Sequence, residues 1–462
     1  MRVTLVSRET IALQLTRFVT ALKYDNLPID VINHTKALVL DQLGVELIGS
    51  TLEWTQPVLR LIEYAPSSNK ESTIVNYGNK TVAWDAAFVN ATFGQGCELD
   101  DMAFGSAGHI GTATIPVALA IGEREHIDGK QFIVSVVAGY EVMYRLMAAV
   151  QPYHAMRGFQ SQGIGGPFAA AAVAGKILSL NEREMVNAFG IAGSHSAGSL
   201  EYDQSGGEVK RMHAGLAARG GIQSAVLAQY GLTGPATIIE GKRGFCHIFA
   251  EKSNPELIVK DLGQTFNVRN TWLKMYPAIA TVHTAIDAVS RLTDEYDIRA
   301  DEVVDIKVGV AEHSLLHGAA IYQPIDVTSA QFSLAFSIAL RIVKRSNDLS
   351  LYMDSTLWND EEIISLSRKV KAYAHPDAHG ERRTLACVDI NLADGRTCHA
   401  IQEYPRGSPK NPAAKEESYQ KFRTLAASAL TEEQIEEVIP IVETIEELDD
   451  ISKLTSSLIS KA

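Results

Sequence analysis

Helical patterns occupy both ends of this chain, whereas strand patterns gather in one internal stretch. Up to about residue 260, apolar side chains recur mostly at helical spacing, with one short strand-like piece at 72–84. The character changes near residue 268. Residues 302–311 alternate as a strand does, and residues 385–404 have the pattern of a hairpin around an Ala-Asp-Gly-Arg turn. From 417 to 460 the pattern is helical again.

This order of patterns predicts a mostly α protein with two domains, which also fits a chain of 462 residues. A large all-helical domain is expected to be built from both chain ends, with a smaller α+β domain inserted between its two parts. The predicted bounds are 1–267 and 406–462 for the helical domain and 268–405 for the inserted one.

Composition excludes several classes of protein. The net charge of −13 argues against a nucleic-acid binder. The longest apolar run, 132–150, contains Glu141 and Arg145, so a buried helix is expected there and not a membrane span. The four cysteines form no C-x-x-C pair, which argues against a zinc or iron–sulfur site built on closely spaced cysteines. The N-terminus has no apolar signal core, so we expect a cytoplasmic protein, with an organelle matrix also open.

Residues 87–116 hold the densest set of candidate chemical groups. A helix of small residues leads into Glu98, Asp100 and Asp101, and a Gly/Ser loop then leads to His109. Carboxylates on one side of a loop and a histidine on the other can form an acid/base site. A solvated acidic turn with a surface histidine is the alternative interpretation.

Two further segments carry cations. Lys210, Arg211 and His213 come just before a helix rich in Ala and Gly, where they could hold a carboxylate or phosphate; basic surface near a helix cap is the alternative. Lys274 lies at the predicted domain boundary, where ligand clefts often form, and His283 follows in a helix. A linker lysine and a core histidine are the alternative there.

Motifs for cofactors are absent from the sequence. The glycines of the loop at 154–167 do not fit G-x-G-x-x-G, and neither a nucleophile elbow nor a Walker loop is present. What remains is a set of carboxylates, His, Lys, Arg and Tyr. Such a set suits proton transfer next to a carboxylate, as in dehydration, decarboxylation or epimerisation of polycarboxylic acids.

The order of several motifs resembles the MmgE/PrpD family, which includes 2-methylcitrate dehydratase and cis-aconitate decarboxylase. The resemblance covers nearly the whole chain. The matching segments are PIDVINHTKALVLDQLGVELIGS, AAFVNATFGQGCELDD…GHIGTATIP, VKRMHAGLAARGG, LKMYPAIATVHTAIDA, AQFSLAFSIAL and YPRGSPKNP.

The resemblance implies a helical domain made from both chain ends, an α+β lid domain, a homodimer, and catalysis without a metal or organic cofactor at a site between the domains. It also implies roles for particular residues. The acidic motif falls on Glu98, Asp100 and Asp101, the loop histidine on His109, and the substrate-binding residues on Lys210, His213 and Lys274, with His283 downstream and Tyr322 as a further contact.

Three departures from the family pattern lie near the expected chemistry. Gln160 stands where active members usually carry the histidine of a His-Pro pair, and glutamine cannot exchange a proton near neutral pH. Glu98 replaces the usual Asp, and His109 is followed by Ile110 instead of Pro.

We therefore expect a cofactor-independent lyase that dehydrates a 2-methylcitrate-like or related alkyl-citrate tricarboxylate. His109 would be the general acid/base, Asp101 and Asp100 would orient it, and Lys210 and Lys274 would bind carboxylates. Decarboxylation of cis-aconitate and isomerisation or epimerisation of a dicarboxylate stay open. A homologue that binds without catalysis also stays open because of Gln160.

Overall fold

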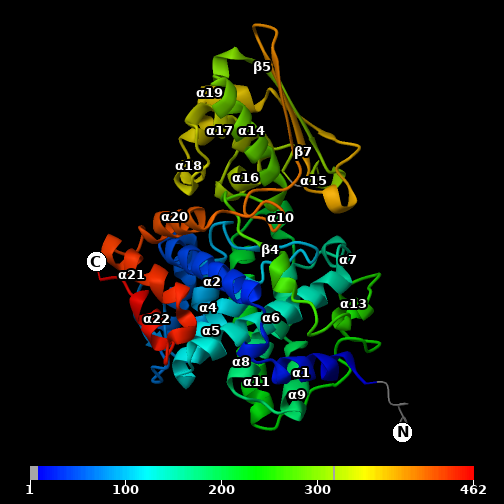
Figure 1. The fold of residues 1–462 in the computed structure, drawn as a ribbon, viewed down its shortest axis with the longest axis vertical. Coiled ribbons are helices and arrows are strands. Elements are labelled where there is room, and N and C mark those ends of the chain that lie inside the picture. Colours follow the sequence, from blue (N-terminus) through cyan, green and yellow to red (C-terminus); the bar gives the residue numbers. More distant parts are fainter. Residues whose placement is uncertain (1–8, 316–317, 462) are drawn as a thin grey trace. The chain divides into compact units, whose positions relative to one another are not determined.

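The computed structural model describes residues 9–315 and 318–461, which divide into two compact units. Unit 1 holds the chain up to Gly96, Asp100–Thr271 and the part from Ala414 onward; unit 2 holds Cys97–Leu99 and Trp272–Ala413. Helices dominate the described residues and the sheets are small, so the prediction of a mostly α protein is confirmed. Figure 1 draws the elements of each unit.

Unit 1 consists of helices with only two-residue strands. Its elements are α1 (Ile11–Ala21), α2 (Ile29–Ser50), α3 (Gln56–Tyr64), β1 (Ser72–Thr73), β2 (Lys80–Thr81), α4 (Ala83–Gly94), β3 (Met102–Ala103), α5 (Gly111–Glu125), α6 (Gly129–Val150), α7 (Tyr153–Met156), α8 (Ser161–Ile177), α9 (Glu182–Ala192), α10 (Tyr202–Ser205), α11 (Val209–Gln229), α12 (Phe245–Ile248), α13 (Glu256–Val259), α20 (Lys415–Ala426), α21 (Glu432–Glu443) and α22 (Ser452–Ser457). A further short strand, β4 (Thr271–Trp272), stands where the chain leaves unit 1.

Small residues let the central helices of unit 1 approach closely. A Cβ added at Gly221 of α11 would lie 2.3 Å from the Cβ of Ala170 and 2.6 Å from the carbonyl oxygen of Pro167, both in α8. On another face of α11, a Cβ at Gly215 would lie 2.5 Å from the carbonyl oxygen of Phe88 in α4. The Ala/Gly-rich helices thus pack backbone against backbone, with α11 between α8 and α4.

The two ends of the chain meet within unit 1 (Figure 1). The orange helix α20 packs against the blue helix α2, and α21 also contacts α2. Ion pairs also join α2 to the C-terminal part of the chain: Lys421 Nζ lies 2.6 Å from Asp41 Oδ1, and Lys36 Nζ lies 2.6 Å from a carboxylate oxygen of Glu446.

Helix α6 is the one helix of the described residues that is long and apolar enough to cross a membrane. It is a core helix of unit 1, because 89% of its most apolar window is buried. Core helices of soluble proteins are often as long and as apolar as a membrane span. Two of its charged residues, Glu141 and Arg145, are paired inside unit 1. Glu141 accepts hydrogen bonds from Arg145 Nε at 3.1 Å and from the backbone N–H of Val268 at 3.0 Å.

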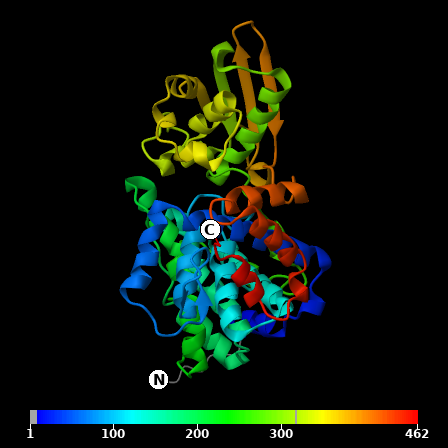
Figure 2. The same ribbon diagram turned by 90° about the vertical axis from the view of Figure 1, so that its left-hand side faces the viewer.

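Unit 2 is built around a sheet of four strands. Its elements are α14 (His283–Tyr296), β5 (Val303–Val310), α15 (Glu312–Leu315), α16 (Val327–Phe332), α17 (Leu334–Lys344), α18 (Leu349–Met353), α19 (Glu361–Ser367), β6 (Val370–Ala374), β7 (Ala386–Leu392) and β8 (Thr397–Gln402). The strand order is β6-β5-β7-β8; β5 runs parallel to β6 and antiparallel to β7. Figure 2 shows the helices of this unit gathered on one face of the sheet, where they bury its apolar side chains.

Three local features differ from the pattern read in the sequence. Strand β6 takes residues 370–374, where no strand was expected, because the backbone of this segment pairs with β5. Helix α8 begins at Ser161, inside the segment expected to be a loop. Helix α11 begins at Val209, so Lys210, Arg211 and His213 lie in its first turns and not before it.

The close packing of α11 predicts an inverted effect for Gly221→Ala. In a helix, alanine is ordinarily more favourable than glycine by about 1 kcal/mol. Here the added methyl group overlaps α8, so we expect the free energy of unfolding in urea to fall by about 1–3 kcal/mol. Gln229→Ala, at an exposed position of the same helix, is the control and should change stability by less than about 0.5 kcal/mol. A stabilised Gly221→Ala protein would contradict the packing described.

Candidate active site

Asp101 fixes the loop that carries His109. Its two carboxylate oxygens each lie 3.1 Å from the backbone N–H of Gly111, the first residue of α5, and Oδ2 accepts a 2.7 Å hydrogen bond from the Tyr140 hydroxyl of α6. A Cβ at Gly111 would lie 2.7 Å from that hydroxyl, so glycine is required there. The carboxylate therefore ties the loop to the start of one helix and the middle of another.

The environment of Asp101 favours its protonated form. Burial raises the pKa of this carboxyl to about 7, although the hydrogen bonds from Tyr140 and Gly111 oppose the shift. Burial and the adjacent carboxylate also raise the pKa of Tyr140 well above its usual value. Tyr140 consequently stays a hydrogen-bond donor throughout the physiological pH range.

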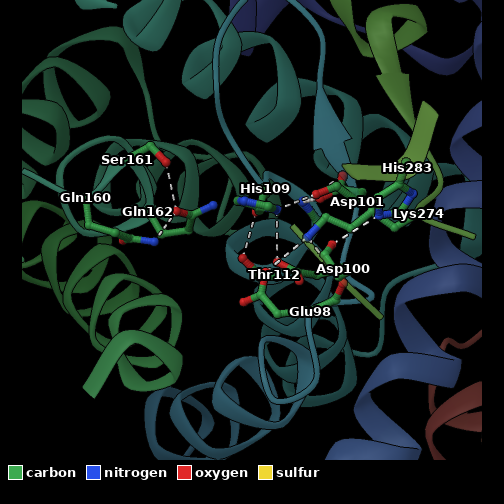
Figure 3. Close-up of polar contacts among 12 residues, drawn as sticks. Glu98, Asp100, Asp101, His109, Thr112, Gln160, Ser161, Gln162, Lys274 and His283 are labelled. Carbon is green, nitrogen blue, oxygen red and sulfur yellow. Dashed lines mark hydrogen bonds and ion pairs between the residues drawn. The ribbon is translucent and has the colours of Figure 1, made fainter. Parts of the chain in front are cut away.

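His109 is oriented by one backbone group and one carboxylate. Its Nδ1 lies 2.7 Å from the carbonyl oxygen of Asp101 and 3.1 Å from Oδ2 of Asp100 (Figure 3). A carbonyl oxygen can only accept, so Nδ1 carries the hydrogen. In the neutral ring Nε2 is then a base, and in the doubly protonated ring it is an acid whose charge Asp100 stabilises.

The two aspartates therefore have different functions. We expected Asp101 to be the main residue that orients the histidine, with Asp100 as a second. In the structure the Asp100 carboxylate faces His109, whereas Asp101 contributes its backbone oxygen and uses its carboxylate to hold the loop. The Thr112 hydroxyl adds a 2.7 Å hydrogen bond to the His109 carbonyl oxygen.

The segment that departs from the family pattern begins α8. Gln160 is the N-cap of this helix, and its Oε1 accepts a 3.0 Å hydrogen bond from the backbone N–H of Gly163. Its Nε2 donates to Oε1 of Gln162. Figure 3 shows the Gln162 amide pointing toward His109, while Gln160 lies farther from this histidine. The residue of this segment that approaches the histidine is thus Gln162.

Lys210, Arg211 and His213, which were expected to hold an anion together, have different surroundings in the structure. Arg211 is buried: its Nε donates to the carbonyl oxygen of Gly96 at 2.8 Å, it pairs with Glu208, and its guanidinium lies 4.9 Å from the centre of the Trp54 ring. Its contacts therefore hold the chain just before the acidic run. Lys210 is half-buried in the same helical turn.

His213 is buried next to this turn. Its ring meets Tyr202 edge to face at 6.0 Å, and Nδ1 has no hydrogen-bond partner among the described residues. Burial, followed by the charge of Lys210, lowers the pKa of His213, so its ring is neutral near pH 7.

In unit 2, the structure brings Lys274 together with Glu98. Lys274 has no exposed surface; its Nζ lies 3.2 Å from the carbonyl oxygen of Glu98 and 3.4 Å from its carboxylate. Glu98 is also buried and has a left-handed backbone, with φ of 60°. This conformation is uncommon for a residue with a side chain and costs about 1–3 kcal/mol, which the surrounding contacts must offset.

The other two predicted residues of unit 2 differ in burial. His283 is fully buried, with Nε2 3.1 Å from the carbonyl oxygen of Ala278 and its ring packed against Trp272 and Tyr276. These contacts are those of a core histidine. Tyr322 is 39% exposed, and its backbone oxygen accepts a hydrogen bond from the Ser367 hydroxyl.

Sequence reasoning missed three residues of this site: Tyr140, Thr112 and Gln162. Tyr140 lies in an apolar helix, where a tyrosine normally signals core packing. Thr112 and Gln162 stand within a few residues of expected site positions, and that closeness in sequence was the only signal available.

One group of the described residues has side chains placed to hold a metal ion. Cys387 and Asp389 of β7 and His399 of β8 have potential ligand atoms within 4.8 Å of one another. Asp389 and His399 are register partners in the sheet, and their side chains already form a 2.7 Å pair. None of the predicted site residues belongs to this group.

Comparison with known proteins gives consistent matches along the chain. A model of the MmgE/PrpD N-terminal domain matches residues 13–258, and a model of the MmgE/PrpD C-terminal domain matches residues 276–447. A cis-aconitate decarboxylase-like protein of Aspergillus oryzae is 26% identical over 96% of this chain and 95% of its own length. The cis-aconitate decarboxylase of Aspergillus terreus is also 26% identical, over 96% of this chain and 95% of its own length, and that of Homo sapiens is 25% identical, over 95% and 92%.

The raised pKa of Asp101 predicts a pH-dependent stability. The folded state holds this proton up to about pH 7, whereas the unfolded chain loses it near pH 4, so wild-type stability falls as pH rises between these values. Asp101→Asn removes the proton equilibrium. Its free energy of unfolding, relative to wild type, should therefore rise between pH 5 and pH 7 by up to about 1.4 kcal/mol per pH unit.

Urea denaturation at several pH values measures this difference. Exposed Asp301→Asn is the control, because the pKa of Asp301 lies below its usual value and the carboxyl group therefore does not titrate in this window. Parallel stability curves for wild type and Asp101→Asn would contradict the assignment.

The buried contact between Lys274 and Glu98 predicts coupling between the two side chains. Lys274→Met should lower the free energy of unfolding by about 3 kcal/mol, because a charged partner is removed from a buried carboxylate. Adding Glu98→Gln should restore at least about 1 kcal/mol of this loss in a double-mutant cycle. Lys371→Met, at an exposed position, should change stability by less than about 0.5 kcal/mol. Strictly additive effects at 274 and 98 would refute the coupling.

Proposed function

The chain belongs to the MmgE/PrpD family, and on that premise we propose that it is a lyase that acts on a polycarboxylate by proton transfer at His109. Both domain models match, so the resemblance read from the sequence is confirmed, and the named relatives support an enzyme. The observation that carries the proposal is the orientation of His109, whose Nδ1 is held by the Asp101 carbonyl oxygen and the Asp100 carboxylate, which leaves Nε2 as the ring nitrogen for proton transfer.

Decarboxylation of a cis-aconitate-like substrate is the reaction we place first, because the relatives are named for it. Loss of carbon dioxide from the allylic carboxylate leaves an electron pair that forms a new double bond. The carbon at the far end of the original double bond then takes a proton. His109 in its doubly protonated form supplies that proton from Nε2, and solvent restores it afterwards.

Dehydration of a 2-methylcitrate-like substrate is the second candidate, and the tautomer of His109 favours it. With the hydrogen fixed on Nδ1, the neutral ring presents Nε2 as a base that can remove a C–H proton next to a carboxylate. The hydroxyl group on the neighbouring carbon then leaves and must gain a proton to become water. The same histidine can return the proton it has taken, so this reaction needs no second acid.

Lys210 is our proposed partner for a substrate carboxylate within unit 1. It is half-buried in the first turn of α11, where the backbone N–H groups of the helix start add positive potential. The pairing of Lys274 with Glu98 gives that lysine a structural function as well as any contact with substrate.

The proposal is tested by incubating the purified protein with cis-aconitate, 2-methylcitrate and citrate and analysing the products by mass spectrometry. Loss of carbon dioxide from cis-aconitate is the expected result, and loss of water from 2-methylcitrate would select the second candidate. Tight binding of these acids without any product would overturn the lyase proposal and favour a binding homologue.

His109→Gln should abolish turnover while leaving the protein folded. Removing a general acid/base group typically costs 10²–10⁴-fold in rate, so we expect kcat to fall by at least about 100-fold. Asp100→Asn should lower kcat less, by about 10-fold, because the ring keeps its hydrogen bond to the Asp101 carbonyl oxygen. Circular dichroism and the unfolding midpoint verify folding. Unchanged kcat in His109→Gln would remove this histidine from the mechanism.

A further inference from the structure

The orientation of two glutamine amides at the start of α8 is determined by one backbone group. The N–H of Gly163 can only donate, and it lies 3.0 Å from the side-chain oxygen of Gln160. That atom of Gln160 must therefore be the oxygen, and the other terminal atom must be the NH₂ group. The orientation of the Gln160 amide is thereby fixed.

The same reasoning extends to Gln162. The NH₂ group of Gln160 donates to the Gln162 side chain, so the atom that receives it is the oxygen of Gln162. The Ser161 hydroxyl lies 2.8 Å from this oxygen and donates to it as well. Two donors thus occupy the Gln162 oxygen, and the atom that remains is the nitrogen Nε2, a donor with two hydrogens.

This nitrogen is buried, and none of the residues that the structure describes accepts a hydrogen bond from it. Gln162 has no exposed surface, and Nε2 has no hydrogen-bond partner among the described residues. Figure 3 shows it pointing toward His109. An unsatisfied buried N–H is costly, so such groups in native proteins are nearly always paired with protein, ordered water or a ligand.

The position of Gln162 is rigid as well as buried. Its neighbour Gly163 packs so tightly that an added Cβ would lie 1.9 Å from the carbonyl oxygen of Ala197. The Ala197 N–H in turn donates to the carbonyl oxygen of Gly163 at 3.0 Å. A donor held this firmly selects its partner by position, because it cannot turn to another acceptor.

We propose that Gln162 is the specificity-determining residue of this site, and that its Nε2 donates to a carboxylate oxygen of the substrate beside the carbon at which His109 transfers a proton. The inference rests on the proposed function for the identity of the substrate, but the donor geometry is independent of it. Gln160, the position that differs from active family members, then acts on the ligand through Gln162, as a positioning residue.

Gln162→Leu tests the proposal because leucine keeps most of the volume and removes the donor. Calorimetric titration with citrate and cis-aconitate should show Kd raised by at least 10-fold, and KM for any substrate turned over should rise in parallel. Leucine also removes the oxygen that accepts from Gln160 and Ser161, so a modest fall of the unfolding midpoint is expected, and Kd is measured well below that midpoint. Gln162→Glu places an oxygen where the donor was and should weaken binding further.

Ser161→Ala is the matched control. It removes one donor to the Gln162 oxygen but leaves the Gln160 contact and the outward nitrogen in place, so Kd should change by less than about 3-fold. An equal loss of affinity in Ser161→Ala and Gln162→Leu would mean that local packing, and not the donor, governs binding, which overturns the proposal.

The remaining outcomes separate this inference from the proposed function. Turnover with unchanged Kd and KM in Gln162→Leu overturns the inference and leaves the function standing. Binding of citrate without turnover, lost in Gln162→Leu, overturns the function and supports the inference. A wild-type protein that binds neither citrate nor cis-aconitate overturns both.

Discussion

The site depends on the hydrogen bond that the backbone N–H of Gly111, the first residue of α5, donates to the carboxylate of Asp101. A carboxyl group buried at this depth is costly, and the N–H of Gly111 and the hydroxyl of Tyr140 offset part of that cost. The backbone oxygen of the same residue then holds Nδ1 of His109. One residue thus closes the loop at both ends, so the histidine is positioned by groups that belong to the rigid helical core.

The three carboxylates of the acidic run have become chemically distinct within a few residues. Asp101 is structural and near its midpoint of protonation at pH 7, and Asp100 faces the histidine. Glu98 turns in the left-handed region and meets a buried lysine. Charge alone does not predict such differences, because each is set by the direction in which the backbone points the side chain. The chain passes from unit 2 to unit 1 between Leu99 and Asp100. Glu98 therefore belongs to unit 2, whereas Asp100 and Asp101 belong to unit 1.

Much of the fold was predictable because its signals are local. Helix α6 covers the buried helix predicted at 132–150, since Asp128 caps its first turn and its apolar pattern persists to Val150. The hairpin of β7 and β8 follows from alternation around a tight turn. Strand β6 was missed because its partner β5 is distant in sequence and parallel, so no hairpin turn announces the pairing.

The meeting of His109 with an aspartate was predictable from the sequence, but which aspartate carboxylate faces the ring was not. His109 and Asp100 stand close enough in sequence for their meeting to be expected. Which aspartate carboxylate faces the ring depends on the backbone path of the loop, and the importance of Gln162 depends on the orientation of an amide two residues away. Neither quantity has a signature in residue type or spacing, because both arise from hydrogen bonds made after the helices have packed.

The packing of α20 and α21 against α2 has a consequence for the order in which a nascent chain can fold. On the ribosome, the residues of unit 2 from Trp272 to Ala413 all emerge before the last segment of unit 1 is made. Lys421, which pairs with Asp41, is therefore absent when the N-terminal helices have already been synthesised. During synthesis, the helical core must hold an incomplete surface along α2, and this surface is a natural place for a chaperone to act until translation ends.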